Sequence, residues 1–272
     1  MATSIPTIPA PLYGKTALVT GGSRGIGRAI AVHLTRLGVS AVALTYASNK
    51  TSADSTLTAI REINPDVKAI AIHADILSPA FAPDLISATL SELDTTTLNI
   101  LVNNAALADP AANQPISSAT HEKFQQLMTG NAWAPTQLTL QALPHLPRGG
   151  RVINISSTAS RQPNQEIATM YGASKAAFDS FTRSLAFNYS AEKGITINSV
   201  CVGPTMTDVM RAIQAAGMTW MEDLKNAATA EKRLAEPEDI ACVVGWLASD
   251  EARWVNGNHV PANGGSMLEL QG

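Results

Sequence analysis

Short apolar runs alternate regularly with longer segments of helical periodicity along most of the chain, which restricts the folds that the chain can adopt. The apolar runs predict strands over residues 16–20, 39–46, 67–74, 98–104, 150–156, 195–201 and 257–262. The segments between them predict helices over residues 26–37, 51–63, 79–93, 120–143, 171–193 and 237–248. Repeated strand–helix units imply an α/β fold with a single parallel, doubly wound sheet and helices on both faces.

No linker divides the 272 residues, so we expect one domain over residues 15–272. Residues 1–14 contain three prolines and predict a flexible N-terminal arm. Residues 204–235 interrupt the alternation. Because ligands in such folds bind beyond the carboxyl ends of the strands, we expect residues 204–232 to form a lid over the site.

Composition excludes several classes of function. A net charge of -3 gives no basic field for nucleic acid or an anionic membrane surface, and no apolar run is long enough to span a bilayer. The N-terminus is not a signal peptide, so we expect a cytoplasmic protein. Cys201 and Cys242 lie in apolar runs and predict reduced core residues. The five histidines lack metal-ligand spacing, so no metal is expected.

A glycine-rich turn, TGGSRGIG at residues 20–27, joins the first strand to the first helix. Gly21, Gly25 and Gly27 permit a tight turn and close approach of a ligand to the backbone. The helix then begins with free N–H groups that face the turn, which suits a diphosphate. The turn predicts a dinucleotide site, although its GxxxGxG spacing differs from the GxGxxG fingerprint.

A second short motif, MYGASK at residues 170–175, places Tyr171 and Lys175 four positions apart on one helix face. An isolated YxxxK is more often a packed tyrosine beside a solvated lysine. The alternative is a tyrosine whose proton affinity is tuned by the neighbouring cation.

These motifs together resemble the short-chain dehydrogenases/reductases. TGGSRGIG, NNAA at 103–106, Asn131, Ser157 and YGASK at 171–175 occur in that family's order and spacing. The resemblance covers the chain from about Lys15 to Met267 and is strongest to NADPH-dependent ketoreductases, such as 3-oxoacyl carrier-protein reductases and fungal hydroxynaphthalene reductases. It implies a Rossmann-type fold and an oxidoreductase.

The resemblance implies four catalytic residues. Tyr171 is expected to be the general acid, with a pKa lowered by Lys175 and by the oxidised nicotinamide. Lys175 would also bind the nicotinamide ribose, Ser157 would orient the substrate oxygen, and Asn131 would hold a water in a proton relay. Ser156 is the alternative to Ser157. We expect the small residues between Tyr171 and Lys175 to leave room for the cofactor.

The end of the second strand reads LTYASNK, residues 44–50, and lacks the carboxylate that would bind an NAD ribose. Ser48 and Asn49 match positions that hold a 2′-phosphate in relatives, and Arg24 is a cation for the same group. These residues favour NADP(H). Alternatively, Ser48 and Asn49 only begin the next helix and Arg24 is solvated.

The resemblance also implies contacts with the rest of the cofactor. Asp75 would bind the adenine amino group or simply cap a strand end, Asn103 and Ala105 would line the ribose and nicotinamide side, and Thr207 would contact the carboxamide. Besides Tyr171 and Lys175, the predicted cofactor-binding set is Gly21, Ser23, Arg24, Gly25, Ile26, Gly27, Tyr46, Ser48, Asn49, Asp75, Ile76, Asn103, Ala105, Pro204, Thr205 and Thr207.

The lid is expected to select the substrate. Its apolar residues suit a small hydrophobic carbonyl compound of secondary metabolism, and no basic cluster marks a phosphorylated or carrier-bound one. They are Met206, Met210, Met218, Trp220 and Met221. The sequence therefore predicts NADPH-dependent reduction of a ketone to a secondary alcohol. Alcohol oxidation by the same residues and a non-catalytic cofactor-binding sensor are the alternatives.

Relatives assemble as tetramers through the two helices predicted at 120–143 and 171–192. The second of these carries apolar residues beyond one core face, namely Ala176, Ala177, Phe178, Phe181 and Leu185. We therefore expect a homotetramer, or a homodimer. Three positions depart from the family pattern: Ala106, Val202 and Asn263.

Overall fold

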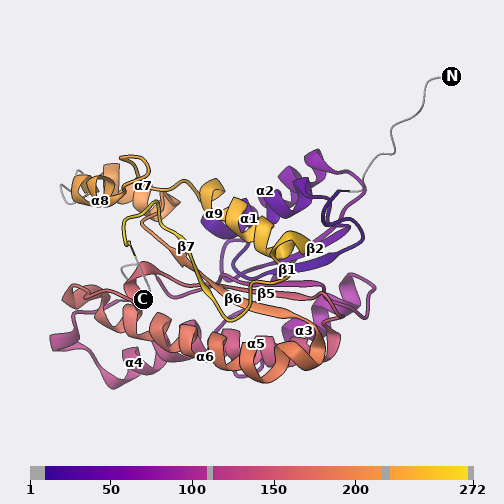
Figure 1. Ribbon diagram of the computed structural model, residues 1–272, viewed down its shortest axis with the longest axis horizontal. Coiled ribbons are helices and arrows are strands. Elements are labelled where there is room, and N and C mark those ends of the chain that lie inside the picture. Colours follow the sequence, from indigo (N-terminus) through magenta and orange to yellow (C-terminus); the bar gives the residue numbers. More distant parts are fainter. Residues whose placement is uncertain (1–9, 109–112, 216–220, 269–272) are drawn as a thin grey trace.

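A computed structural model describes residues 10–108, 113–215 and 221–268. It contains one sheet of seven parallel strands in the order β3-β2-β1-β4-β5-β6-β7 (Figure 1). The strands are β1 Thr16–Val19, β2 Ala41–Tyr46, β3 Lys68–His73, β4 Ile100–Asn103, β5 Arg151–Ile155, β6 Thr196–Val202 and β7 His259–Ala262. The order reverses between β1 and β4, so the carboxyl ends of these two strands flank the crevice in which doubly wound folds bind ligands.

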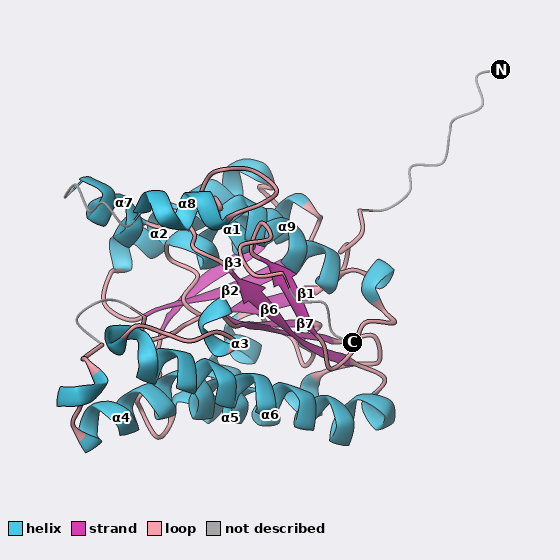
Figure 2. Ribbon diagram, turned by 60° about the vertical axis from the view of Figure 1, so that its left-hand side comes forward, coloured by secondary structure: helices cyan, strands magenta, loops and turns pink. Residues whose placement is uncertain are grey.

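Helices cover both faces of the sheet (Figure 2). One layer holds α1 Gly25–Arg36, α2 Lys50–Ile63 and α9 Pro237–Ala248. The opposite layer holds α3 Phe81–Glu92, α4 His121–Met128, α5 Ala134–Ala142 and α6 Thr169–Lys193. The predicted doubly wound architecture is confirmed.

Two hydrophobic clusters fill the space between the sheet and its helices. Alternate residues of each strand point to opposite faces, so Val19 packs toward α1 and α9 while Leu18 packs toward α3 and α5. In β5, Ile153 likewise packs toward α1 and α9, and Val152 packs toward α3 and α5. Both faces of the central strands are therefore apolar, which explains their continuous hydrophobic runs.

The helix predicted over residues 120–143 is interrupted. A π-helical turn, Thr129–Trp133, separates α4 from α5. Pro135 lies at the start of α5, and its ring would clash with the carbonyl of Asn131 in an unbroken α-helix. Such turns are frequent at functional sites, and this one contains Asn131.

Two predictions about peripheral residues were wrong. Part of the predicted arm belongs to the body, because Leu12 is fully buried and its N–H donates to the Leu37 carbonyl over 2.9 Å. Cys242 is exposed on α9, whereas Cys201 is buried as expected. Both errors arise because apolar or proline-rich sequence does not reveal which face of an element meets the core.

The segment predicted as a lid forms α7 Asp208–Ala215 and α8 Met221–Ala227. Its methionines do not all face outward: Met206 and Met221 are buried with Leu234, and Met210 and Leu224 pack against them. Met218 and Trp220 lie outside the described residues. Within the described parts of the chain, no helix is long and apolar enough to cross a membrane.

Candidate active site

The glycine turn forms a close-fitting cradle beside β4. Gly21 has a φ of 63°, and a Cβ there would lie 3.0 Å from Asn104 Nδ2. A Cβ on Gly27 would collide with the Gly21 carbonyl oxygen. No side chain caps the start of α1 at Arg24, so the first N–H groups of the helix remain available for an anion. The turn therefore fits the diphosphate of a dinucleotide.

Asn104 holds this cradle and was missed by the sequence reasoning. Its Nδ2 donates to the carbonyl oxygens of Thr20 and Gly21 over 2.9 and 3.2 Å, and its N–H donates to Thr20 Oγ1 over 2.9 Å. The paired asparagines of NNAA are the signal in the sequence that points to this residue.

Asn103 differs from its predicted role. Its buried Nδ2 donates to Asn154 Oδ1 over 2.8 Å and to Thr139 Oγ1 over 3.0 Å, so the side chain points into the core and not toward a ribose. Ala105 does lie at the turn, where its N–H donates to Thr20 Oγ1 over 3.0 Å. Side chains alternate between the two faces of a sheet, and that of Asn103, the last residue of β4, points toward α5.

Of the three residues predicted to hold a 2′-phosphate, one caps the next helix and the other two are exposed. Asn49 caps α2, since its Oδ1 accepts from the Ser52 N–H over 2.9 Å. Ser48 and Arg24 are exposed. The Tyr46 ring packs edge-on against His73, with ring centres 5.6 Å apart. Ser48 and Arg24 are therefore accessible to a phosphate, whereas the Asn49 side chain is already engaged.

The other predicted adenine-side and turn residues are also placed. Asp75 is exposed, and its Oδ1 accepts from the Leu77 N–H over 2.9 Å, which is the alternative capping role. Ile76 packs against the π-helical turn. Ser23 accepts a hydrogen bond from Thr56 through its carbonyl over 3.0 Å, and Ile26 packs against the core.

The loop after β6 approaches the glycine turn. A Cβ on Gly25 would lie 3.5 Å from the methyl group of Thr207. Thr205 Oγ1 donates to the Gly203 carbonyl over 2.9 Å, which stiffens the loop. Thr207 is therefore placed beside the cradle, as predicted for a cofactor contact.

Helix α6 brings the reactive side chains together. Lys175 is buried, its Nζ donates to the Ile155 carbonyl over 2.8 Å, and Nζ lies 5.9 Å from the centre of the Tyr171 ring. Ser157, directly after β5, interacts with the Tyr171 phenol, whereas Ser156 is turned away into the interior. The choice of Ser157 over Ser156 is consistent with this geometry.

Burial has the largest effect on the pKa values of Tyr171 and Lys175. Burial raises the pKa of Tyr171 above its ordinary value, Ser157 acts in the opposite direction, and Asp179 raises it further. Burial also lowers the pKa of Lys175 to about 8, which Asp179 partly offsets. The expected lowering of the Tyr171 pKa is therefore not found in the protein alone, because loss of hydration outweighs the hydrogen bond from Ser157.

Asn131 ties three segments together from the π-helical turn. Its Oδ1 accepts from the Leu107 N–H over 2.7 Å, and its Nδ2 donates to the Leu107 carbonyl and to Ser174 Oγ, each over 3.1 Å. Ser174 Oγ also donates to the Tyr171 carbonyl. Asn131 is thus joined to the catalytic helix, with its side chain committed to these bonds.

Two of the three small residues between Tyr171 and Lys175 pack against the chain itself, whereas the prediction was that all three leave room for a cofactor. A Cβ on Gly172 would lie 2.6 Å from the Ala159 carbonyl oxygen. Ser174 is buried against Asn131, and Ala173 is exposed. Gly172 therefore lets α6 approach the loop that carries Ser157.

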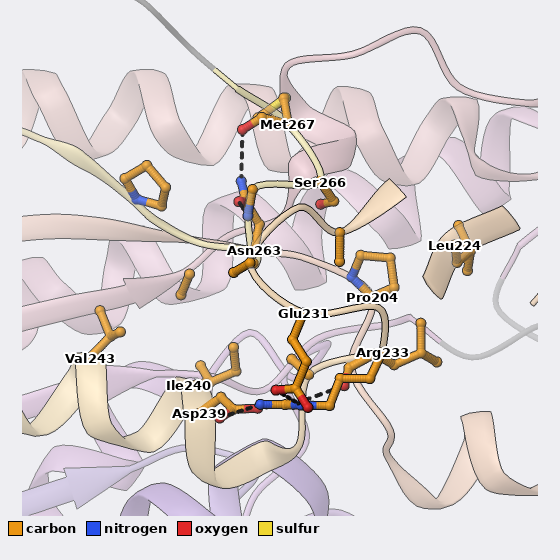
Figure 3. A pocket seen from close by; sticks show the side chains of 18 of the residues that line it. Pro204, Leu224, Glu231, Arg233, Asp239, Ile240, Val243, Asn263, Ser266 and Met267 are labelled. Atoms are coloured by element: carbon orange, nitrogen blue, oxygen red, sulfur yellow. Dashed lines mark hydrogen bonds and ion pairs between the residues drawn. The ribbon is translucent and has the colours of Figure 1, made fainter. Parts of the chain in front are cut away.

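A cavity of about 550 Å³ lies beyond Pro204, between α8, α9 and the segment after β7 (Figure 3). The Arg233 side chain lies in the wall of this cavity, where it forms ion pairs with Asp239 over 2.6 Å and with Glu231 over 2.8 Å. Neither Tyr171 nor Lys175 lines this cavity. It is therefore separate from the reactive centre.

Comparisons with known proteins agree with this site. The family model described as enoyl-(acyl carrier protein) reductase matches residues 21–267. The short chain dehydrogenase penD of Penicillium thymicola is 50% identical over 267 residues, which cover 97% of this chain and 96% of that protein.

Two solved ketoreductases have the same fold. The promiscuous reductase LugOII, which catalyses keto-reduction at C1 during lugdunomycin biosynthesis, is 36% identical with a TM-score of 0.86, covering 95% of this chain and 100% of its own. The angucycline C-6 ketoreductase LanV, solved with bound NADP, is 34% identical with a TM-score of 0.85, covering 96% and 98%. With these matches and the Ser157–Tyr171–Lys175 geometry, the chain belongs to the short-chain dehydrogenase/reductase family and is an oxidoreductase.

Proposed function

We propose that the protein reduces a ketone on a small hydrophobic substrate to a secondary alcohol, with NADPH as the cofactor and Tyr171 as the general acid. The observation that carries this proposal is the meeting of Ser157, Tyr171 and Lys175 next to a glycine cradle shaped for a diphosphate. When bound, NADPH supplies the hydride.

The protein groups divide the remaining chemistry. Tyr171 has a raised pKa, so its phenol stays protonated at neutral pH and can donate that proton to the carbonyl oxygen. Ser157 donates a hydrogen bond to the same oxygen and orients it. The Lys175 ammonium favours the phenolate that forms as the proton leaves.

Preference for NADP(H) is supported by charge at the end of β2. Residues 46–50 contain no carboxylate. A carboxylate at this position would bind the ribose of NAD and would repel the 2′-phosphate of NADP. Arg24 and Ser48 are exposed there, and Arg24 makes no ion pair within the described residues. The NADP bound to LanV supports the same choice.

The substrate class is supported by relatives that act in biosynthesis. LugOII and LanV are named as ketoreductases of lugdunomycin and angucycline compounds, respectively. Part of the lid interior is apolar, with Met210 and Leu224 only partly buried. A hydrophobic ketone of secondary metabolism therefore fits better than a charged substrate, and reduction fits better than alcohol oxidation.

The direct test is a titration with NADPH and NADH followed by absorbance at the nicotinamide band with a panel of hydrophobic ketones. We expect tighter NADPH binding and ketone-dependent NADPH oxidation. Arg24→Ala should weaken NADPH binding by about tenfold and leave NADH binding unchanged, because it removes a charge-assisted contact to the 2′-phosphate. Arg28→Ala, exposed one turn further along α1, is the matched control.

Two results would contradict the proposal. Preference for NADH would show that the end of β2 does not bind a phosphate. Binding of NADPH with no oxidation across a broad ketone panel would favour a sensor over an enzyme.

A further inference from the structure

The segment between Ser157 and α6, residues 158–168, contains an amide side chain that no step of the proposed reaction uses. This residue is Asn164, which is half-buried. Its Nδ2 donates to the Ala159 carbonyl over 2.8 Å and to the Gln162 carbonyl over 3.0 Å. An asparagine amide has two N–H hydrogens, so both of them are engaged. The side chain therefore closes the segment into a compact loop.

The same amide packs against α6 at the residue that follows Tyr171. A Cβ on Gly172 would collide with Asn164 Nδ2 and would lie 2.6 Å from the Ala159 carbonyl oxygen. Gly172 is itself buried. Asn164 therefore lies between the loop that follows β5 and the first turn of the catalytic helix, in contact with both.

Ala159 connects this amide to Ser157. The Ala159 carbonyl accepts from Asn164, and the N–H of Ala159 donates to Ser157 Oγ over 3.2 Å. The Ser157 carbonyl accepts from the Ser160 N–H over 3.0 Å and from Ser160 Oγ over 2.8 Å. The Ser157 hydroxyl is thus held by its own loop, and Asn164 holds the far side of that loop against α6.

The bond from Ala159 also determines what the Ser157 hydroxyl can donate. A serine hydroxyl has one hydrogen and two lone pairs. The Ala159 N–H occupies one lone pair, so the hydrogen stays available for a substrate oxygen. A rotation of the Ala159 peptide would remove this partner and release the hydroxyl from its orientation.

The surroundings of Asn164 require a side chain that donates. Its Nδ2 faces two backbone carbonyl oxygens, from Ala159 and Gln162. An aspartate has the same shape, but its carboxylate oxygens would face these carbonyl oxygens with no hydrogen between them. An amide is therefore needed for its hydrogen-bond donors and not only for its size.

We propose that Asn164 is a positioning residue for the reduction, which holds the Ser157 loop against α6 so that Ser157 and Tyr171 reach the same substrate oxygen. It acts through Ala159 and does not touch the reacting atoms. This inference rests on the proposed roles of Ser157 and Tyr171.

Asn164→Asp is the first test, because it keeps the shape of the side chain and removes both donors. At saturating ketone, kcat should fall by at least about tenfold, since a small displacement of a catalytic group slows the reaction strongly. NADPH binding should stay within about twofold of the wild type, because the glycine turn is unchanged. Gln165→Glu makes the same chemical change at the next residue, which is exposed, and should retain the wild-type kcat.

A double-mutant cycle with Ser157→Ala separates positioning from a general loss of structure. Once the Ser157 hydroxyl is absent, Asn164→Asp has no hydroxyl to displace, so its effect on kcat should shrink to within about twofold. Single-turnover reduction of a hydrophobic ketone, followed by absorbance at the nicotinamide band, measures these slow variants.

A loss of kcat from Asn164→Asp that is as large in the Ser157→Ala background as in the wild type would overturn the proposal. A wild-type kcat in Asn164→Asp would do the same. If Asn164→Asp does not fold, Asn164→Ala replaces it in the same cycle, because it removes both donors without adding a charge. A wild-type kcat in Ser157→Ala alone would instead refute the proposed role of Ser157, and this inference with it.

Discussion

At the residue scale, backbone atoms and burial set the chemistry of the reactive groups. The sequence was sufficient to predict which residues meet, because Tyr171 and Lys175 share a helix face and Ser157 follows a strand end. It could not predict the direction of the Tyr171 pKa, since burial depends on how α6 packs against β5. Nor could it show that the Asn103 side chain turns inward while Asn104 holds the glycine turn.

The buried Lys175 ammonium should destabilise the folded protein by a measurable amount. Burial lowers its pKa to about 8, so the charged form is less favourable in the folded chain than in the unfolded one. Lys175→Met should therefore raise the free energy of unfolding by about 1–3 kcal/mol at pH 7 while abolishing turnover. Urea denaturation of both proteins checks this, and a destabilised Lys175→Met would contradict it.

The stability of the wild type should also depend on pH. Between about pH 8, where the folded chain releases the Lys175 proton, and pH 10.5, the ordinary value, the unfolded chain binds more protons. Stability relative to Lys175→Met should therefore rise with pH through this window and stay constant below it. Denaturation midpoints measured from pH 6 to 10 would show the rise.

At the element scale, the strands and most helices follow from period and turn signals, but two packing features do not. The π-helical turn at Thr129–Trp133 arises where Pro135 begins α5 and Asn131 must reach Leu107 and Ser174. Gly172 is needed because α6 lies against the loop after β5. Both requirements come from segments distant in sequence, so no local pattern reports them.

Gly172→Ala tests this close approach. The added methyl group would lie 2.6 Å from the Ala159 carbonyl oxygen, which is backbone and cannot rotate away. We expect a loss of about 1–3 kcal/mol in stability and a fall in kcat, because the Ser157 loop must shift. Ala173→Ser, at the adjacent exposed position, is the control. Unchanged stability and kcat in Gly172→Ala would show that the two segments are not tightly packed.

At the scale of the whole molecule, large aromatic side chains remain exposed on both helix layers. Phe124, Trp133, Phe181 and Phe187 belong to the α4–α6 layer, and Phe187 is 87% exposed. Phe178 and Leu185, predicted as interface residues, are instead 1% and 8% exposed and belong to the core. We propose that these exposed aromatics contribute to the predicted homotetramer or homodimer.

Phe187→Glu should weaken the proposed self-association. A charge in an apolar interface opposes burial, so we expect at least about a tenfold increase in the dissociation constant. Sedimentation velocity at micromolar protein measures it. Tyr13→Glu, at another exposed aromatic position on an N-terminal turn, should have no effect. A wild-type monomer would contradict the assembly.

Ketone-dependent NADPH oxidation by Tyr171→Phe tests whether Tyr171 is the general acid. The change removes one hydroxyl group and keeps the ring, so NADPH binding should stay within about twofold of the wild type. Loss of the general acid should lower kcat by at least about 100-fold, while Tyr189→Phe on the same helix should retain full activity. Turnover by Tyr171→Phe at the wild-type rate would exclude Tyr171 as the general acid.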